Sequence, residues 1–416
     1  MEEQRSSHLS KELKVFFAIV AITGFAMGMS DNVISNFFKD AYDVTAQQRG
    51  FLEIPRESPG LICFLVIAFT SGIGDVRLSI ISQLLCIAGS LALGLFTPSF
   101  AVMATFIFVN SLGNHIYMPL QDSIGLSIIG QEDPGKRMGQ YSALRTAFMM
   151  LASVLVFFGF RFGFFSFKTP IKLPFLIAAF SFAGVFLLYL FLYAKYKVHG
   201  EARKKQFQIL VRKEYTLYYI LAVLAGVHRQ IMIVFGPWVL VDILSQQADT
   251  LALLGIISSC FGALFLPAVG RWIDRFGTKT LLLAEGCLLI LIRTAYGYMS
   301  SAFTVGTLAK VGFPVLVISS LFVFERITLQ FAIVRTAYLR SIAVDPADIT
   351  PTLSFGLSMD HVVAITCAYL GGVAWNLYGP QYVFYIAAVL SILNVIVAIL
   401  IKPAPKAAPA ALDAES

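Results

Sequence analysis

The chain has 416 residues, of which 58% are hydrophobic and 13% are charged, and its formal net charge is +7 at pH 7. A soluble globular protein is about a quarter charged, and one this apolar would expose large hydrophobic patches to water, so the composition excludes an ordinary soluble protein and favours a lipid bilayer as the surroundings. Most cations lie between apolar runs, where they indicate topology and lipid contacts rather than nucleic-acid binding.

About twelve apolar runs follow one another along the chain, and each is close to the roughly 20 residues that a helix needs to cross a bilayer. We expect the first set of spans at residues 15–37, 50–73, 78–95, 100–128, 138–160 and 173–194, and the second set at 215–244, 251–269, 280–298, 311–338, 353–375 and 382–401. The sequence therefore predicts an all-α integral membrane protein with about twelve transmembrane helices in two six-helix halves.

A basic segment separates the two sets of runs and is the expected linker. We expect an N-terminal six-helix bundle at residues 1–196, a basic cytoplasmic linker at 197–213, a C-terminal six-helix bundle at 214–402 and a disordered tail, rich in Ala and Pro, at 403–416. All five cysteines lie inside apolar runs without metal-ligand spacing, so we interpret them as small buried side chains.

Lysine and arginine predict the orientation of the chain. The linker and the alternate connections on its side hold most of these cations, and both ends of the chain fall on that side. By the positive-inside rule this side is cytoplasmic, which predicts a multi-pass protein of the cell (inner) membrane with both termini in the cytoplasm. Arg161, Lys168 and Lys172 depart from this pattern on the opposite side.

A short polar turn at residues 270–279 separates the eighth run from the ninth and holds three cations, one anion and two glycines. Its Asp274 occupies the place that Asp75 holds after the second run, and an Asp-Pro turn at Asp133 matches another at Asp345. Two matches in the same order indicate that the halves are copies of one repeat.

The pattern of Gly270, Asp274, Arg275, Gly277 and Lys279 resembles the signature loop of the major facilitator superfamily, in which glycines flank an aspartate followed by basic residues. That superfamily usually carries the loop between spans two and three, with a weaker copy between spans eight and nine, whereas here the second-half copy is the stronger. The resemblance implies two six-helix halves that rock about a central site near the bilayer midplane.

The same resemblance implies a gating role for the two loops. Asp274 is expected to accept hydrogen bonds at the N-terminus of a neighbouring helix and to latch the cytoplasmic gate of the outward-facing state. The first-half copy keeps Asp75 but departs from the pattern at Ser71, Val76 and Leu78.

Ionisable side chains inside spans are energetically costly, so each is a candidate functional residue. Asp31 lies late in the first run, and Glu53 and Glu57 lie one helical turn apart in the second. We expect these carboxylates to take part in proton coupling. The alternative interpretation is that Asp31 marks a helix end and that the two glutamates belong to a solvated helix end.

The candidate substrate-binding residues come from four further runs: Asn114, Tyr117, Arg229, Arg326 and Asp360. Arginine binds carboxylate and phosphate groups bidentately, and Asp360 is a possible counter-ion. For Asn114 and Tyr117, hydrogen bonding between neighbouring helices is an equally good interpretation.

We find no nucleophile elbow, phosphate loop, dinucleotide-binding glycine motif or metal-spaced His/Cys cluster, so the sequence predicts neither an enzyme nor a cofactor nor a metal site. The favoured function is a secondary active transporter, proton-coupled, for a small polar solute that is zwitterionic or anionic. The alternatives are an efflux antiporter for amphiphilic compounds and a non-transporting membrane sensor. The expected partners are the solute, a proton or other coupling ion and membrane lipids, without nucleic acid, and we expect a monomer.

Overall fold

The computed structural model describes residues 2–70, 72–129, 134–196, 211–345 and 348–401, and these residues form helices joined by turns, without strands. Most of the expected linker and the whole of the expected tail at 403–416 lie outside the described residues, as does Asp133 of the first Asp-Pro turn. Large apolar side chains such as Phe69 and Leu264 are 84% and 76% exposed, as a lipid-facing surface requires.

The described residues of the first half form eight helices, because the first two expected spans are each interrupted. In chain order they are α1 (Glu2–Asp31), α2 (Ile34–Tyr42), α3 (Ala46–Phe51), α4 (Glu53–Phe69), α5 (Asp75–Leu95), α6 (Phe100–Ile129), α7 (Pro134–Arg161) and α8 (Leu173–Tyr196). The first helix begins well before the apolar run, since its polar N-terminal residues are helical too.

The second half begins with a short 3₁₀ turn, η1 (Lys213–Tyr215), and its spans seven and ten are irregular. The elements are α9 (Thr216–Trp238), the π-helical η2 (Val239–Ile243), α10 (Ala248–Val305), α11 (Phe313–Thr328), the 3₁₀ turn η3 (Leu329–Phe331), α12 (Ala332–Ile342), α13 (Ile349–Tyr378) and α14 (Pro380–Leu400).

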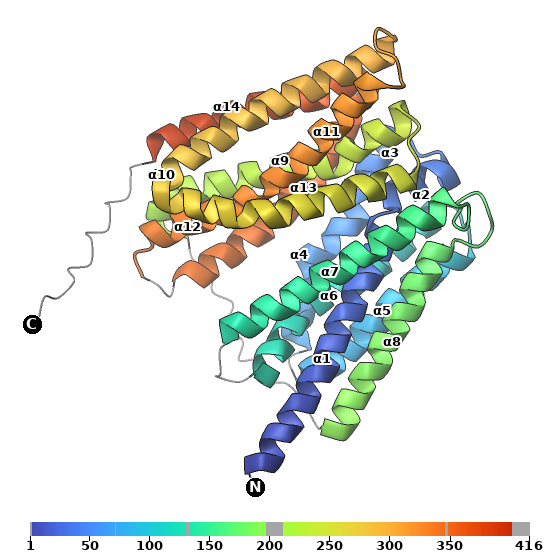
Figure 1. Cartoon of the computed structure of the whole chain (residues 1–416), viewed down its shortest axis with the longest axis vertical. Helices are drawn as coiled ribbons and strands as arrows, with labels where there is room; N and C mark the ends of the chain where they lie inside the picture. The colour runs from blue at the N-terminus through green and yellow to red at the C-terminus, as the bar shows by residue number, and fades with distance from the viewer. Residues whose placement is uncertain (1, 71, 130–133, 197–210, 346–347, 402–416) are drawn as a thin grey trace, which may run out of the picture.

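Ten helical segments of the described chain are long and apolar enough to cross a membrane. One of them, α10, has 58 residues and folds back on itself at Gly277, so that it supplies two antiparallel spans (Figure 1). The 17-residue α4, preceded by α3, supplies another. The prediction of an all-α membrane fold with about twelve helices is confirmed.

The polar turn at residues 270–279 is more compact than a loop. Both sides of it are helical, and only Gly277 leaves the helical conformation, with φ 78° and ψ 161°. Lys279 then donates hydrogen bonds to the backbone oxygens of Ile399 and Ile401, at 2.7 and 2.8 Å. A cation at these last carbonyls of α14 is favourable, so Lys279 fixes the hairpin of α10 against α14.

The two halves meet at the face opposite the chain ends (Figure 1). Lys39 pairs with Asp242 at 2.8 Å, and Asn36 donates to the backbone oxygen of Gln246 at 3.0 Å. Closer to the centre, a Cβ atom on Gly50 of α3 would lie 2.2 Å from the backbone oxygen of Ala368 in α13, so glycine is required for this approach. Figure 1 shows the two bundles diverging from this contact toward the chain ends.

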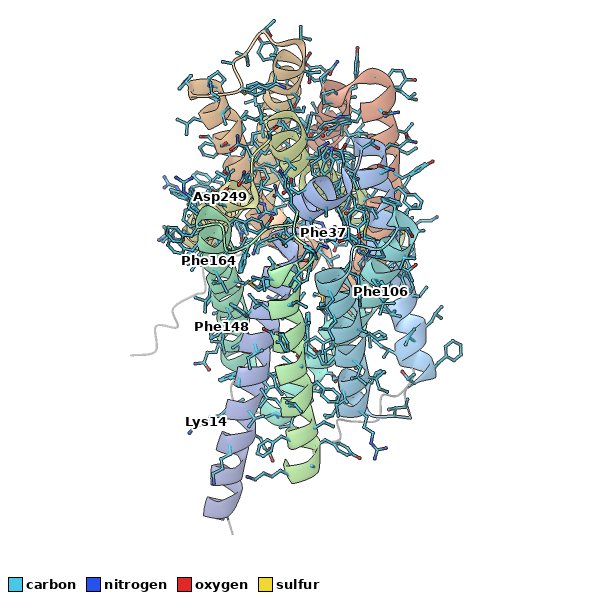
Figure 2. The ribbon with its side chains drawn as sticks, turned by 90° about the vertical axis from the view of Figure 1, so that its right-hand side faces the viewer. Lys14, Phe37, Phe106, Phe148, Phe164 and Asp249 are labelled. Carbon is cyan, nitrogen blue, oxygen red and sulfur yellow. The ribbon has the colours of Figure 1, made fainter. Side chains whose placement is uncertain are left out.

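Two of the three cations that depart from the orientation pattern, Lys172 and Arg161, have local structural partners. Lys172 is fully buried and donates to Thr97, to the backbone oxygen of Pro170 at 2.9 Å and to that of Phe96 at 3.4 Å, just past the end of α5. Arg161 at the end of α7 lies 3.8 Å from Asp249 of the other half. Figure 2 shows Asp249 beside the loop that carries Phe164, far from Lys14 near the N-terminal end of α1. These cations therefore stabilise helix ends and the contact between halves.

Replacing Gly277 with alanine should lower the free energy of unfolding by about 1–3 kcal/mol, because its backbone conformation is open essentially only to glycine. Gly270→Ala is the matched control: it lies in the same hairpin, its backbone is helical, and a Cβ atom meets nothing within 4 Å at either position. Unfolding of the purified protein in detergent measures both variants, and an equal loss in the two would contradict the role of Gly277.

Candidate functional site

In the described part of the chain four spans are interrupted, and charged residues accompany the interruptions. Asp31 ends α1, Glu53 follows the break at Leu52 between α3 and α4, Asp242 lies in the π-helix η2, and Arg326 lies one turn before η3. Broken helices leave backbone groups free at membrane depth, and in transporters they mark binding sites.

Glu53 is the most completely paired charge in the centre of the molecule. Arg49 and Arg56 each place Nη1 2.5 Å from its Oε1, and Gln230 of α9 donates to its Oε2 at 2.9 Å. The Glu53 side chain is fully buried, and that of Arg49 is 1% exposed, with its guanidinium over the ring of Phe38. Because both oxygens are already bonded, this geometry favours a fixed link between α4 and α9 over the proton-carrying role that we expected for Glu53.

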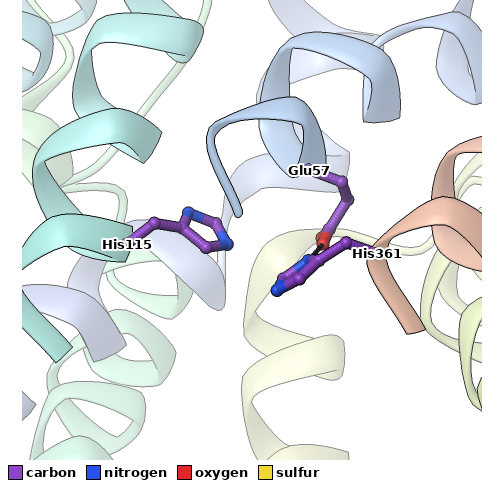
Figure 3. Close-up of side chains that lie close together, drawn as sticks. All are labelled: Glu57, His115 and His361. Carbon is purple, nitrogen blue, oxygen red and sulfur yellow. Dashed lines mark hydrogen bonds and ion pairs between the residues drawn. The ribbon is translucent and has the colours of Figure 1, made fainter. Parts of the chain in front are cut away.

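Glu57 lies one turn further along α4 and meets the other half through a histidine. Its Oε2 is 3.0 Å from Nδ1 of His361 in α13, and the ring of His361 lies 5.2 Å from that of His115 in α6 (Figure 3). All three side chains can ligate a metal ion. The sequence did not predict this cluster, because single histidines in different spans give no spacing signal.

Asp31 and Arg326 face each other across the space between the halves. Both side chains are exposed to solvent, although both belong to spans. Asp31 lies within electrostatic reach of Arg56 and Glu57 in its own half and of Arg326 in the other. Arg326 stacks over the ring of Phe322 at 5.2 Å, which leaves its guanidinium edge available.

The C-terminal half contains an open cavity of about 340 Å³ that is lined by three ion pairs. Arg229 pairs with Asp360, Arg293 Nη2 lies 2.7 Å from Glu325 Oε1, and Arg335 Nη1 lies 2.7 Å from Glu285 Oε1. The structure therefore brings together Arg229 and Asp360, two separately predicted candidates, and it adds Glu285, a lone carboxylate in an apolar run that was not among the predicted site residues.

Asn114 and Tyr117 make their hydrogen bonds within the N-terminal half and do not line the C-terminal cavity. Asn114 donates to Asn110 at 3.1 Å, and Asn110 in turn donates to Ser90 of α5 at 2.9 Å. The hydroxyl of Tyr117, which is fully buried, lies 3.1 Å from that of Tyr189 in α8. Hydrogen bonding between neighbouring helices, the alternative interpretation of this polar stripe, accounts for these contacts.

The two matched aspartates of the repeat have different surroundings. Asp75 is buried in the first turn of α5 and accepts a hydrogen bond from Ser123 of α6 at 2.5 Å. Asp274 is exposed, and the neighbouring Arg275 lies over the ring of Phe276. On the opposite face, a hydrogen bond from Lys39 lowers the pKa of the exposed Asp43 carboxyl.

No protein-family model and no curated protein sequence matches this chain. Solved structures do match it. The nucleoside transporter NupG superposes with a TM-score of 0.72 at 15% identity, over 93% of this chain and 98% of NupG. A bacterial homologue of the iron transporter ferroportin, in an inward-facing state, superposes with a TM-score of 0.71 at 14% identity, over 94% of this chain and 98% of that protein. An auto-inhibited POT family peptide transporter superposes with a TM-score of 0.68 at 12% identity, over 96% of this chain and 99% of that protein.

All three are transporters with the major facilitator fold, and the matches cover nearly the whole of each chain. At these identities the likeness establishes the fold. The fold that the signature loop predicted is therefore confirmed: the chain has the multi-pass, two-half architecture of major facilitator transporters.

Arg293→Met should lower the free energy of unfolding by about 3–5 kcal/mol, because it leaves the buried Glu325 carboxylate without its cation. The matched control is Arg161→Ala, which removes a 67% exposed guanidinium from a 3.8 Å pair and should cost less than about 1 kcal/mol. Adding Glu325→Leu to Arg293→Met should recover most of the loss. Chemical unfolding in detergent measures all three, and a double variant no more stable than Arg293→Met would contradict the pairing.

Proposed function

We propose that the chain is a secondary active transporter that moves a small polar solute, zwitterionic or anionic, across the cell (inner) membrane by alternating access. The observation that carries this proposal is a set of charged side chains that both halves place inside or at the ends of their spans, with Asp31 and Arg326 beside breaks of the helices. Asp31 and Glu57 come from the N-terminal half, and Arg229, Arg326 and Asp360 come from the C-terminal half. Residues from both halves can then contact one solute and release it when the halves rock.

The charge balance of this centre supports a solute with both signs of charge. Counting Glu53 and its two arginines, the central groups comprise four carboxylates and four guanidiniums: Asp31, Glu53, Glu57, Asp360, Arg49, Arg56, Arg229 and Arg326. Arg326 and Arg229 suit a carboxylate or phosphate, because guanidinium binds such groups bidentately. The cavity beside Arg229 and Asp360 supplies the space for a small molecule.

Asp31 is the carboxylate best placed for proton coupling. It ends α1 at the break before α2, where its side chain is accessible, and no described cation lies within ion-pair distance of it. Glu53, by contrast, is enclosed by two arginines and a glutamine. A carboxylate that must take up and release a proton needs such access and freedom.

The gating proposal follows from the face at which the halves meet. With the termini in the cytoplasm, contacts such as Lys39–Asp242 lie on the outer side, so the structure corresponds to an inward-facing state. We assign Gly270, Asp274, Arg275, Gly277, Lys279 and Asp75 to the cytoplasmic gate. Asp274 is exposed here because its latch belongs to the outward-facing state.

A proteoliposome screen of nucleosides, dipeptides and other zwitterionic or anionic metabolites, read with a proton-sensitive dye, tests the transport proposal. Once a transported solute is found, Asp31→Asn should abolish proton-driven accumulation while solute exchange continues, because the amide cannot carry the proton. Asp43→Asn removes a carboxylate that is 86% exposed at the far face and should leave accumulation unchanged. Proton movement retained in Asp31→Asn would remove Asp31 from the coupling step, and solute binding without flux would favour a sensor.

Asp274→Asn should reduce the outward-facing population, because the amide is a weaker partner for a helix N-terminus than the carboxylate. Single cysteines placed on the two faces of the centre, in a background without the native cysteines, report this population by their rates of alkylation. Arg271→Gln in the same hairpin is the control for a change of local charge. Equal alkylation rates in Asp274→Asn and the unmodified background would contradict the latch.

A further inference from the structure

We propose that Glu57, His115 and His361 form a binding site for one divalent transition-metal ion of the class that imidazole and carboxylate prefer, such as Zn²⁺, Co²⁺ or Ni²⁺, and that the ion ties the two halves together. One ligand atom from each side chain lies within 4.8 Å of the other two. The side chains come from α4, α6 and α13, so elements far apart in the sequence converge on one point (Figure 3).

His115 is already oriented as a metal ligand. Its Nδ1 lies 2.9 Å from the backbone oxygen of Ser111 and 3.0 Å from the hydroxyl oxygen of the same residue. A backbone oxygen only accepts hydrogen bonds, so Nδ1 carries the proton and the lone pair is left on Nε2. Figure 3 shows the ring extending toward His361 and Glu57. A histidine fixed through one nitrogen by a carbonyl is the usual arrangement around a bound metal.

The His361 ring is held against α4 by the shape of that helix. Gly60 lies one turn after Glu57, and a Cβ atom on it would lie 2.4 Å from Cε1 of His361. Only glycine leaves room for the ring at this place. The ring then lies with Nδ1 3.0 Å from Oε2 of Glu57, which brings a carboxylate oxygen and an imidazole nitrogen from opposite halves together.

The spacing of these atoms fits a metal ion after a small side-chain adjustment. Zinc bonds to histidine nitrogen and carboxylate oxygen are about 2.0–2.2 Å long, so ligand atoms around a tetrahedral ion lie roughly 3.4 Å apart. The three ligand atoms lie within 4.8 Å of one another here, so small rotations of the three side chains bring them to that separation. Three protein ligands leave a position for water. A site with two imidazoles is poorly suited to Mg²⁺ or Ca²⁺, which favour oxygen ligands.

The nearest cation does not oppose this site strongly. Arg56 is close enough to act electrostatically on both Glu57 and His115. Its guanidinium is bonded to Glu53 at 2.5 Å, however, so much of its charge is neutralised. Asp360, beside His361, adds a further carboxylate near the site and is itself paired with Arg229.

Binding at this site would favour one conformation of the protein. Glu57 and His115 belong to the N-terminal half and His361 to the C-terminal half, so a single ion would link both. A ligand shifts an equilibrium toward the state that it binds more tightly. The ion would therefore stabilise the arrangement described here and slow its interconversion. This inference goes beyond the proposed transport of a solute and needs no knowledge of that solute.

The test is a titration of the full-length protein, freed of any affinity tag, with Co²⁺ alone in detergent, followed by visible absorption and competition with Zn²⁺. One ion per chain is expected. His115→Ala, His361→Ala and the conservative Glu57→Gln should each lower the affinity tenfold or more. His228→Gln, which changes a histidine of the C-terminal cavity, is the matched control and should bind as the unmodified chain does.

Thermal unfolding with and without Zn²⁺ tests the link between halves. Zn²⁺ should raise the Tm of the unmodified chain, because an ion that binds only the folded state stabilises it, and should leave the Tm of His361→Ala unchanged. The proposal is overturned if the unmodified chain binds no stoichiometric Co²⁺, if binding persists undiminished in His115→Ala and His361→Ala, or if bound Zn²⁺ leaves the Tm of the unmodified chain where it was.

Discussion

The pairing of Glu53 with Arg49, Arg56 and Gln230 is the constraint on which the centre of the molecule depends. A carboxylate and a guanidinium that are almost fully buried cannot exchange partners with water, so each must be satisfied by the protein. Because Gln230 comes from the other half, satisfying Glu53 also sets the distance between α4 and α9. The neighbouring Glu57–His361 contact then lies at a fixed height on the same helix, and the freer groups Asp31 and Arg326 are left facing the space between the halves.

Much of the architecture could be predicted from the sequence, because length and hydropathy decide whether a segment spans a bilayer. The breaks could not. In span one the sequence offered a helix end at Asp31 only as the alternative interpretation, because the apolar run resumes at Val33 and the composition alone fits a continuous helix as well as a broken one. The hairpin at Gly277 was expected as a loop, whereas the helix continues to either side and one glycine makes the turn. Local preferences leave such details open, and packing decides them.

The candidate site could be predicted only in part, and the reason is again physical. A charge in an apolar run is rare enough to identify Asp31, Glu53, Glu57, Arg229 and Asp360 individually. Which charges pair depends on contacts in three dimensions. The pairs of Glu53 with Arg49 and Arg56 can be predicted from helix geometry, because these residues lie four and three positions away. The pair of Glu57 with His361 cannot be predicted in this way, because the two residues are far apart in the sequence. Asn114 and Tyr117 show the converse, since a polar stripe can serve packing between helices as readily as binding.

The one-residue turn of α10 has a mechanical consequence. In the first half α4 ends at Phe69 and α5 begins at Asp75, so several residues separate the two helices. In the second half the two arms of α10 share a single non-helical residue, and Lys279 clamps that corner to the end of α14. The two arms of α10 and the end of α14 are thereby held together as one unit. A displacement of the corner beside Asp274 therefore moves α14 together with both arms of α10.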